Sequence, residues 1–135
     1  MTKFSYTINR QSSVGMSLID IKLSSGAVGL TVSALVDSGA SLNILPLDVG
    51  TQLGLVWEDQ TFPINLGGVL EGVQAYSVIL DAIVGDLQPT NLAFAWVNRP
   101  STQIRTLLGQ VNFFQEFDVY FYGSTQAFEV QTKTA

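Results

Sequence analysis

The segment Val36-Asp37-Ser38-Gly39-Ala40-Ser41 is the part of the chain whose residue types could most clearly do chemistry. The apolar residues before it resemble the end of a buried strand, and Asp37 ends that strand abruptly because Ser38 and Gly39 are turn-forming residues. The Asp37 carboxylate is therefore predicted at the tip of a buried strand, held by a tight loop. Such a carboxylate is costly to bury unless donors compensate, and the Ser38 hydroxyl and the following backbone N–H groups are the nearest candidates.

The residue types that the chain lacks narrow this chemistry further. The sequence of 135 residues contains no His and no Cys. Ser-His-Asp triads, Cys-His pairs, His-ligated zinc, thiolate metal sites and disulfides are therefore all excluded. If the protein is an enzyme, the side chains that transfer protons must be carboxylates, Lys or Tyr.

Charge and composition limit the class of partner. Six Lys and Arg against 11 Asp and Glu give a net charge of −5, so neither nucleic acid nor a membrane surface is an expected partner. Only 13% of the residues are charged and 47% are hydrophobic, which favours apolar surface that meets another subunit; a compact β domain with a large core is the alternative. No apolar run has the length of a signal peptide or a membrane span, so we expect a soluble, cytoplasmic protein, and a longer parent chain stays open.

The hydrophobic pattern predicts mostly strands, joined by turns at Ser24-Ser25-Gly26 and Gly123-Ser124-Thr125. The expected strands cover residues 16–23, 30–36, 76–84, 92–97, 117–122 and 127–131. Two short helices are also expected: one from Pro46 to about Leu53, and a single turn that Asn112 begins as a side-chain cap. The pattern as a whole predicts one all-β domain over residues 1–135.

Two segments downstream of Asp37 support the interpretation that Asp37 belongs to a functional site. Thr106-Leu107-Leu108-Gly109 is a second apolar pair that ends in Gly, and it leads directly into the second helical turn. Gly67-Gly68-Val69-Leu70-Glu71-Gly72 is a Gly-rich tip between strand-like arms, which indicates a mobile β-hairpin; a plain surface turn is the alternative. Asp-Ser-Gly alone is also an ordinary turn. The functional interpretation therefore depends on its combination with the Leu-Leu-Gly segment and the Gly-rich tip.

This combination resembles the retropepsin-like aspartic proteases, small one-domain relatives of pepsin. Order and spacing match over a core of about residues 15–131, and the Leu-Leu-Gly-Gln ending that continues into Phe113-Phe114 is most similar to bacterial cytoplasmic members. The resemblance implies a retropepsin-like closed β-barrel, the acid-protease half-fold, with a Gly-rich flap hairpin and one or two short helices.

The resemblance also implies a mechanism and a partner. These proteases hold two Asp carboxylates around one water, whereas this chain has one Asp-Ser-Gly. The second carboxylate is then Asp37 of an identical chain, which a two-fold homodimer brings into place. The resemblance thus predicts an aspartic endopeptidase that hydrolyses peptide bonds of extended peptides or proteins, with no metal and no cofactor.

Roles for other residues follow from the same resemblance. Asp37 is the catalytic residue, and Ser38 and Gly39 support its loop. Gln110 and Ser41 stand where viral members carry an ion pair, so a neutral hydrogen bond is expected to replace it. The residues expected to contact substrate are Ala40, Ser41, Gly68, Val69, Leu70, Glu71 and Leu107.

A second class of function stays open at this point. A catalytically weak module that keeps the fold and serves peptide binding or dimerisation is the alternative, since fold does not dictate function. The natural substrate, the dimer strength and any self-processing from a precursor are not predicted.

Overall fold

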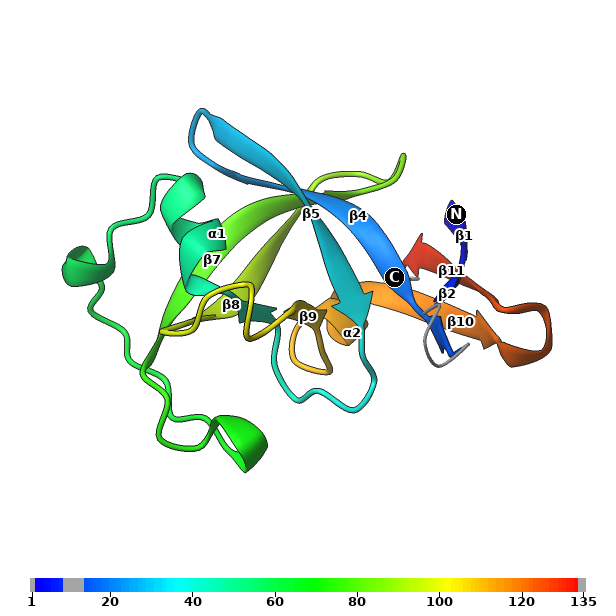
Figure 1. Ribbon diagram of the computed structural model, residues 1–135. Coiled ribbons are helices and arrows are strands. Elements are labelled where there is room, and N and C mark those ends of the chain that lie inside the picture. The colour runs from blue at the N-terminus through cyan, green and yellow to red at the C-terminus, as the bar shows by residue number, and fades with distance from the viewer. Residues whose placement is uncertain (1, 9–13, 134–135) are drawn as a thin grey trace.

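A closed barrel of six strands is the central feature of the computed structural model, which describes residues 2–8 and 14–133 (Figure 1). Its strands are β4 (Leu18–Ser25), β5 (Val28–Val36), β6 (Ile44–Leu45), β7 (Ala75–Val84), β8 (Thr90–Val97) and β9 (Thr106–Leu108). They neighbour one another around the barrel in the order β4-β5-β9-β6-β8-β7. The predicted all-β fold with a closed barrel is thereby confirmed.

The barrel forms because its long strands alternate between apolar and polar residues. In β4, Ile19, Ile21 and Leu23 are buried, whereas Asp20 and Lys22 point outward and are exposed. β4 pairs antiparallel with β5 along its whole length, and β7 pairs in the same way with β8. The inward side chains of the four strands therefore make one continuous core.

The ends of the first strands differ from prediction. The stretch predicted as one strand from residue 16 is interrupted, because Met16 belongs to β3 (Gly15–Met16), which pairs with β2 (Thr7–Ile8). The first turn lies at Gly26 and Ala27, because Ser24 and Ser25 continue the β4–β5 ladder instead of leaving it.

Helix α1 (Leu47–Gln52) packs against β8 and confirms the first predicted helix, shortened at both ends. Its glycine is explained by packing: a Cβ on Gly50 would lie 2.2 Å from Nε1 of Trp96. That same indole nitrogen donates a hydrogen bond of 3.1 Å to the Leu47 carbonyl. The glycine that lowers helix propensity is thus the one that lets the helix approach Trp96.

Helix α2 (Phe113–Glu116) confirms the second predicted helix, but its expected cap is wrong. Asn112 makes no side-chain hydrogen bond to the helix. Its Oδ1 instead accepts a hydrogen bond of 3.1 Å from the backbone N–H of Ala93 in β8. The Asn112 side chain therefore makes a long-range hydrogen bond instead of the local helix cap that the sequence pattern predicted.

A second sheet lies beside the barrel and contains β1 (Thr2–Ser5), β10 (Phe117–Tyr122) and β11 (Ala127–Thr132) in the order β1-β11-β10 (Figure 1). The sequence pattern predicted β10 and β11 but not β1, whose four residues are too few to show a period. β1 pairs with β11 from Thr2↔Val130 to Ser5↔Ala127, so the two ends of the described chain share one sheet.

The expected flap is a loop, residues 62–77, whose arms pair only at their base. The backbone N–H of Ser77 donates to the Phe62 carbonyl at 2.8 Å and that of Ile64 to the Ala75 carbonyl at 2.9 Å. The tip is a single 3-10 turn, Gly68–Leu70, rather than the end of two long paired strands. The Gly-rich tip is in the predicted place, but its arms do not form a fully paired hairpin.

Candidate active site

Asp37 begins the loop that leaves β5, where two parallel strands lie side by side. β5 and β9 pair in parallel, with Val36 opposite Leu108. The backbone N–H of Asp37 continues this ladder by donating to the Leu108 carbonyl at 2.9 Å. The two apolar runs that the sequence singled out are thus neighbours, and Leu108, which is fully buried, lies directly beneath the Asp37 loop.

The Asp37 loop is closed by hydrogen bonds within itself. The N–H of Gly39 donates to Oδ1 of Asp37 at 2.9 Å, and the N–H of Ala40 donates to the Asp37 carbonyl at 3.1 Å. The side chain of Asp37 is half-buried. A backbone donor therefore compensates part of the cost of holding this carboxylate out of bulk water, as the sequence led us to expect, and the tight turn fixes its direction.

A second loop, which follows β9, fastens the first one. The N–H groups of Gln110 and Val111 donate to the carbonyls of Ala40 and Ser41, both at 2.9 Å. The side-chain Nε2 of Gln110 donates to the Ser38 carbonyl at 2.8 Å. A neutral hydrogen bond does form from Gln110, and its acceptor is the Ser38 backbone rather than a side chain of Ser41.

The close approach of the two loops requires Gly109. A Cβ at this position would lie 2.6 Å from the Leu42 carbonyl oxygen and 2.7 Å from that of Ala40. Any other residue would push the loops apart, so the Leu-Leu-Gly motif ends in Gly for a steric reason.

Asn43 ties the loop after β9 to the barrel wall, and the sequence did not single it out. It is 1% exposed, and its Oδ1 accepts a hydrogen bond of 2.8 Å from the Gly109 N–H. Its Nδ2 donates to the Ala93 carbonyl at 2.9 Å. The signal that could have found it is a lone amide inside the apolar run from Leu42 to Leu45, because such a residue is buried only when it is fully bonded.

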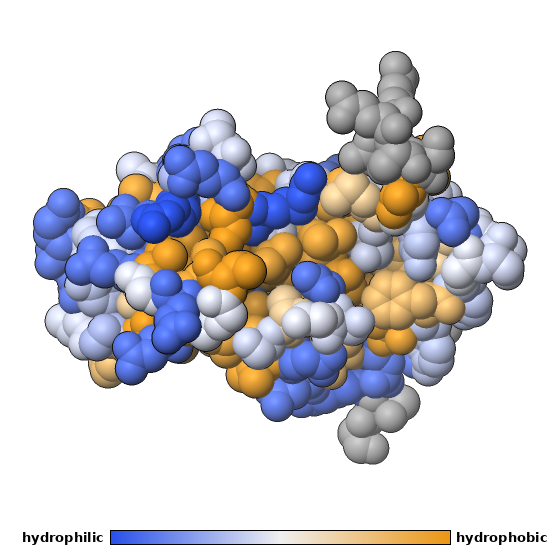
Figure 2. All heavy atoms as spheres, turned by 60° about the horizontal axis from the view of Figure 1, so that its bottom comes forward, coloured by the Kyte–Doolittle hydropathy of each residue, from blue (hydrophilic) through white to orange (hydrophobic). Residues whose placement is uncertain are grey.

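Above these loops lies a cleft of about 470 Å³. It is lined by Asp37, Gly39, Ala40, Ser41, Leu42, Ile44, Asn65, Leu66, Gly67, Gly68, Val69, Leu70 and Leu107. Figure 2 shows the face of the molecule that carries these loops, across which hydrophobic residues form a band. The cleft thus joins the Asp37 loop, the flap tip and the start of the Leu-Leu-Gly motif, three segments that are far apart in the sequence.

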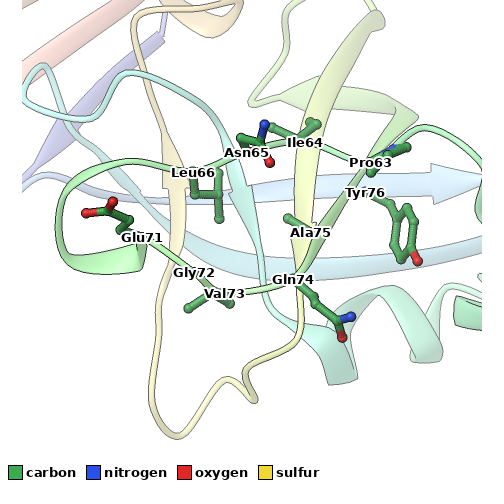
Figure 3. Close-up of a pocket in the computed structure, with 10 residues that line it drawn as sticks. All are labelled: Pro63, Ile64, Asn65, Leu66, Glu71, Gly72, Val73, Gln74, Ala75 and Tyr76. Atoms are coloured by element: carbon green, nitrogen blue, oxygen red, sulfur yellow. The ribbon is translucent and has the colours of Figure 1, made fainter.

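The predicted contact residues are brought together with one exception. Ala40, Ser41, Gly68, Val69, Leu70 and Leu107 all line the cleft. Glu71 lies instead at a separate space of about 500 Å³ between the two arms of the flap, together with Tyr76 at the flap base (Figure 3). Leu42, Ile44 and Leu66 line the cleft without having been predicted, because their apolar side chains look like ordinary core in the sequence.

Asp37 is the single acidic residue among the described residues that line the cleft. The other Asp-x-Gly of the chain begins at Asp48, which lies in α1 and accepts hydrogen bonds from Ser101 Oγ at 2.5 Å and from the Ser101 N–H at 2.6 Å. The bond from the Ser101 hydroxyl is the main cause that lowers the pKa of Asp48. Within residues 2–8 and 14–133, no group of three or more Asp and Glu side chains is placed to hold a metal ion.

Two solved structures share the fold. A retropepsin-like aspartic protease from Rickettsia conorii matches with a TM-score of 0.66 and 14% identity, over 97% of this chain and 99% of that one. The EIAV protease in complex with the inhibitor HBY-793 matches with a TM-score of 0.54 and 16% identity, over 76% of this chain and 86% of that one. At these identities the likeness concerns the fold alone. A search of curated protein sequences found no significant relative.

Membership of a family rests on the sequence itself. A family model described as aspartyl protease matches residues 23–111. That stretch includes the Asp37 loop, the flap and Gly109, and it makes up more than half of the 135 residues. The chain has a retropepsin-like fold and belongs to the aspartyl protease family.

Proposed function

We propose that this protein is an aspartic endopeptidase whose catalytic pair consists of Asp37 from each of two identical chains. One observation carries the proposal: among the described residues that line the cleft under the flap there is a single carboxylate, held by an Asp-Ser-Gly loop that is fastened to the Leu-Leu-Gly loop. A two-fold axis beside that loop would bring the carboxylate close to its own copy. The proposal treats residues 1–135 as one protease domain, with its core at about 15–131.

The chemistry follows from placing two carboxyl groups around one water. Two carboxylates about 3 Å apart cannot both ionise, so the pair shares one proton. The charged carboxylate takes a proton from the water as its oxygen attacks the scissile carbonyl carbon, and the protonated carboxyl gives its proton to the carbonyl oxygen. Collapse of this tetrahedral diol breaks the C–N bond: the amine nitrogen leaves with a proton from the pair, and one diol hydroxyl returns its proton to the pair as the new carboxyl group forms.

An extended peptide is the substrate that the cleft fits. Its floor offers the loop of Gly39, Ala40 and Ser41, where backbone groups can pair with a peptide backbone, and its roof is the flap tip. The roles of these residues, and of the Ser38 hydroxyl as a link between the two subunits, belong to this proposal.

The apolar side chains at the cleft predict its preference. Ile44, Leu66 and Leu107 line it, and no basic residue is among its described lining residues. We therefore expect cleavage beside hydrophobic side chains, which would bury their surface against these residues.

The test is cleavage of an unbiased peptide mixture, from about pH 4 to 7, by the wild type and Asp37→Asn in parallel. The proposal expects cuts by the wild type that Asp37→Asn does not make. Asp20→Asn serves as a matched control because Asp20 is exposed on β4, outside the cleft. Cuts that persist in Asp37→Asn would overturn the mechanism. If the wild type makes no cuts as a dimer, the alternative of a peptide-binding or dimerisation module replaces the protease.

A further inference from the structure

The two arms of the flap are joined at their base and stand apart above it. The last backbone bond between them runs from the Ile64 N–H to the Ala75 carbonyl at 2.9 Å. Nearer the tip, the Val73 N–H donates to the Leu70 carbonyl of its own turn instead of crossing to the other arm. Within the described part of the chain no further backbone bond joins the arms, and the space of about 500 Å³ lies between them (Figure 3).

Apolar side chains from both arms line this space. Ile64 and Leu66 come from the first arm, and Val73 and Ala75 come from the second. All four are half-buried or buried, and they belong to the same hydrophobic cluster as Leu107 of the cleft. A straight aliphatic side chain placed between the arms would therefore exchange water for apolar contacts on two sides.

Glu71 carries the one charge among the described residues that line the space. Its side chain is exposed and lies at the end of the space nearest the flap tip (Figure 3). Asn65, Gln74 and Tyr76 add uncharged groups that can accept hydrogen bonds. The charged group that this arrangement favours is a cation that donates hydrogen bonds.

The chain itself does not supply that cation. Its sequence has no Lys and no Arg between Lys22 and Arg99. Arg99 lies close to the second arm, because the N–H of the preceding Asn98 donates to the Gln74 carbonyl at 2.9 Å. Its Nη1, however, donates to the Asn98 carbonyl at 2.8 Å. Among the residues that the structure describes, Glu71 makes no ion pair.

The space adjoins the cleft that contains Asp37. Asn65 and Leu66 line both, so a single arm of the flap separates one from the other. An extended peptide presents alternate side chains to opposite sides of its backbone. A side chain that such a peptide directs toward the flap meets the first arm, and a long, unbranched one reaches the space behind it.

We infer that the space between the flap arms receives a Lys or Arg side chain of the substrate. Its methylene stem packs against Leu66 and Val73, and its cation pairs with the Glu71 carboxylate. The inference rests on the proposed function, because the peptide that carries this side chain is the substrate in the cleft. It adds a preference for a basic residue elsewhere in the peptide to the hydrophobic preference at the cleaved bond.

The experiment compares peptide libraries in which one position at a time is fixed as Lys or as norleucine, which has an unbranched aliphatic side chain without the ammonium group. We expect one position at which the wild type cleaves the Lys library about two- to five-fold faster in kcat/KM, the range of a solvent-exposed ion pair. The preference should weaken as the salt concentration rises.

Variants at Glu71 test which residue causes the preference. Glu71→Gln keeps the size of the side chain and should cleave the Lys and norleucine libraries equally well. Glu71→Lys should instead favour Glu at the same position, a reversal that a merely damaged flap would not produce. Glu58→Gln is the matched control, because Glu58 is exposed in the 3-10 turn Trp57–Asp59 and lines neither the space nor the cleft.

Binding of the labelled libraries to Asp37→Asn, measured by fluorescence polarisation, separates this inference from the proposed function. A preference for Lys in binding that Glu71→Gln removes supports the inference even if the wild type cuts nothing. A wild type that cuts peptides but favours Lys at no position overturns the inference and leaves the protease standing, as does a preference that persists in Glu71→Gln. A protein that neither binds nor cuts these peptides refutes both.

Discussion

Asn43 fixes the loop after β9 against the barrel. Its side chain bonds to the Gly109 N–H and the Ala93 carbonyl, so one amide joins the loop after β9 to the wall of the barrel. Alanine would leave these two buried groups without their partner and would open a small cavity.

We expect Asn43→Ala to lower the free energy of unfolding by about 2–4 kcal/mol. The measurement is urea unfolding, with Asn91→Ala as control because Asn91 is exposed on β8 near Ala93. A loss below about 0.5 kcal/mol would mean that water replaces the amide without penalty.

Gly109 provides a steric test of the same junction. Gly109→Ala must move the carbonyls of Ala40 and Leu42, and we expect it to cost about 1–3 kcal/mol of unfolding free energy. It should also reduce peptide cleavage, because Ala40 belongs to the loop that holds Asp37. Gly123→Ala is the matched control, since a Cβ there meets nothing within 4 Å. Equal stability of both variants would show that the loops can separate freely.

At the scale of elements, the Asp48–Ser101 contact fastens α1 to the loop after β8. Hydrogen bonds from Ser101 lower the pKa of Asp48, so the folded carboxylate binds a proton less readily than the unfolded one. The stability that this contact contributes is therefore fully present above the unfolded pKa, 3.8, and is lost as the pH falls through the folded pKa.

We expect Asp48→Asn to be less stable than the wild type near neutral pH, by less than about 1 kcal/mol because solvent screens this exposed site. The difference should shrink as the pH falls below 3.8 and through the lowered folded pKa, because the wild-type carboxyl then becomes neutral as well. Urea unfolding of both proteins at several pH values measures it. A difference that stays constant as the pH falls would contradict the assignment.

The strands also show which parts of the fold can be predicted from the sequence alone. Strands β4, β5, β7, β8, β10 and β11 were predictable, because alternation over six or more residues reports a buried face directly. β1, β6 and β9 were not, because two to four residues carry no period and their pairing is decided by partners far away in the chain. Asn112 failed as a cap for the same reason.

The candidate site divides in the same way. Asp37, the flap tip and Leu107 were found because a motif of distinctive residue types marks each segment. Asn43 and Leu66 were not found, since the role of an amide or a leucine depends on contacts with loops that are distant in the sequence.

At the scale of the whole molecule, the proposed active site, shared by two chains, would make activity depend on association. Mixing the wild type with an equal amount of Asp37→Asn should give about a quarter of dimers with two intact carboxyl groups, if the chains pair at random. Activity per wild-type chain should then fall to about half, because half of those chains pair with an inactive partner. The assay is cleavage of a fluorogenic peptide after the two proteins have been mixed and left to exchange.

Asp20→Asn mixed in the same ratio should leave activity per chain that carries Asp37 unchanged. Undiminished activity in the Asp37→Asn mixture, once exchange is verified by mass spectrometry, would show that one chain suffices.

The pairing of β1 with β11 bears on how the molecule is made. Thr2 lies opposite Val130, so β1 is synthesised long before its partner strand β11. During translation the barrel strands can find one another in order, while β1 must wait, exposed, until β11 has emerged. The three-stranded sheet then forms only after all six barrel strands have been synthesised. A nascent chain whose β11 has not yet emerged would accordingly have a nearly complete barrel and an unpaired β1.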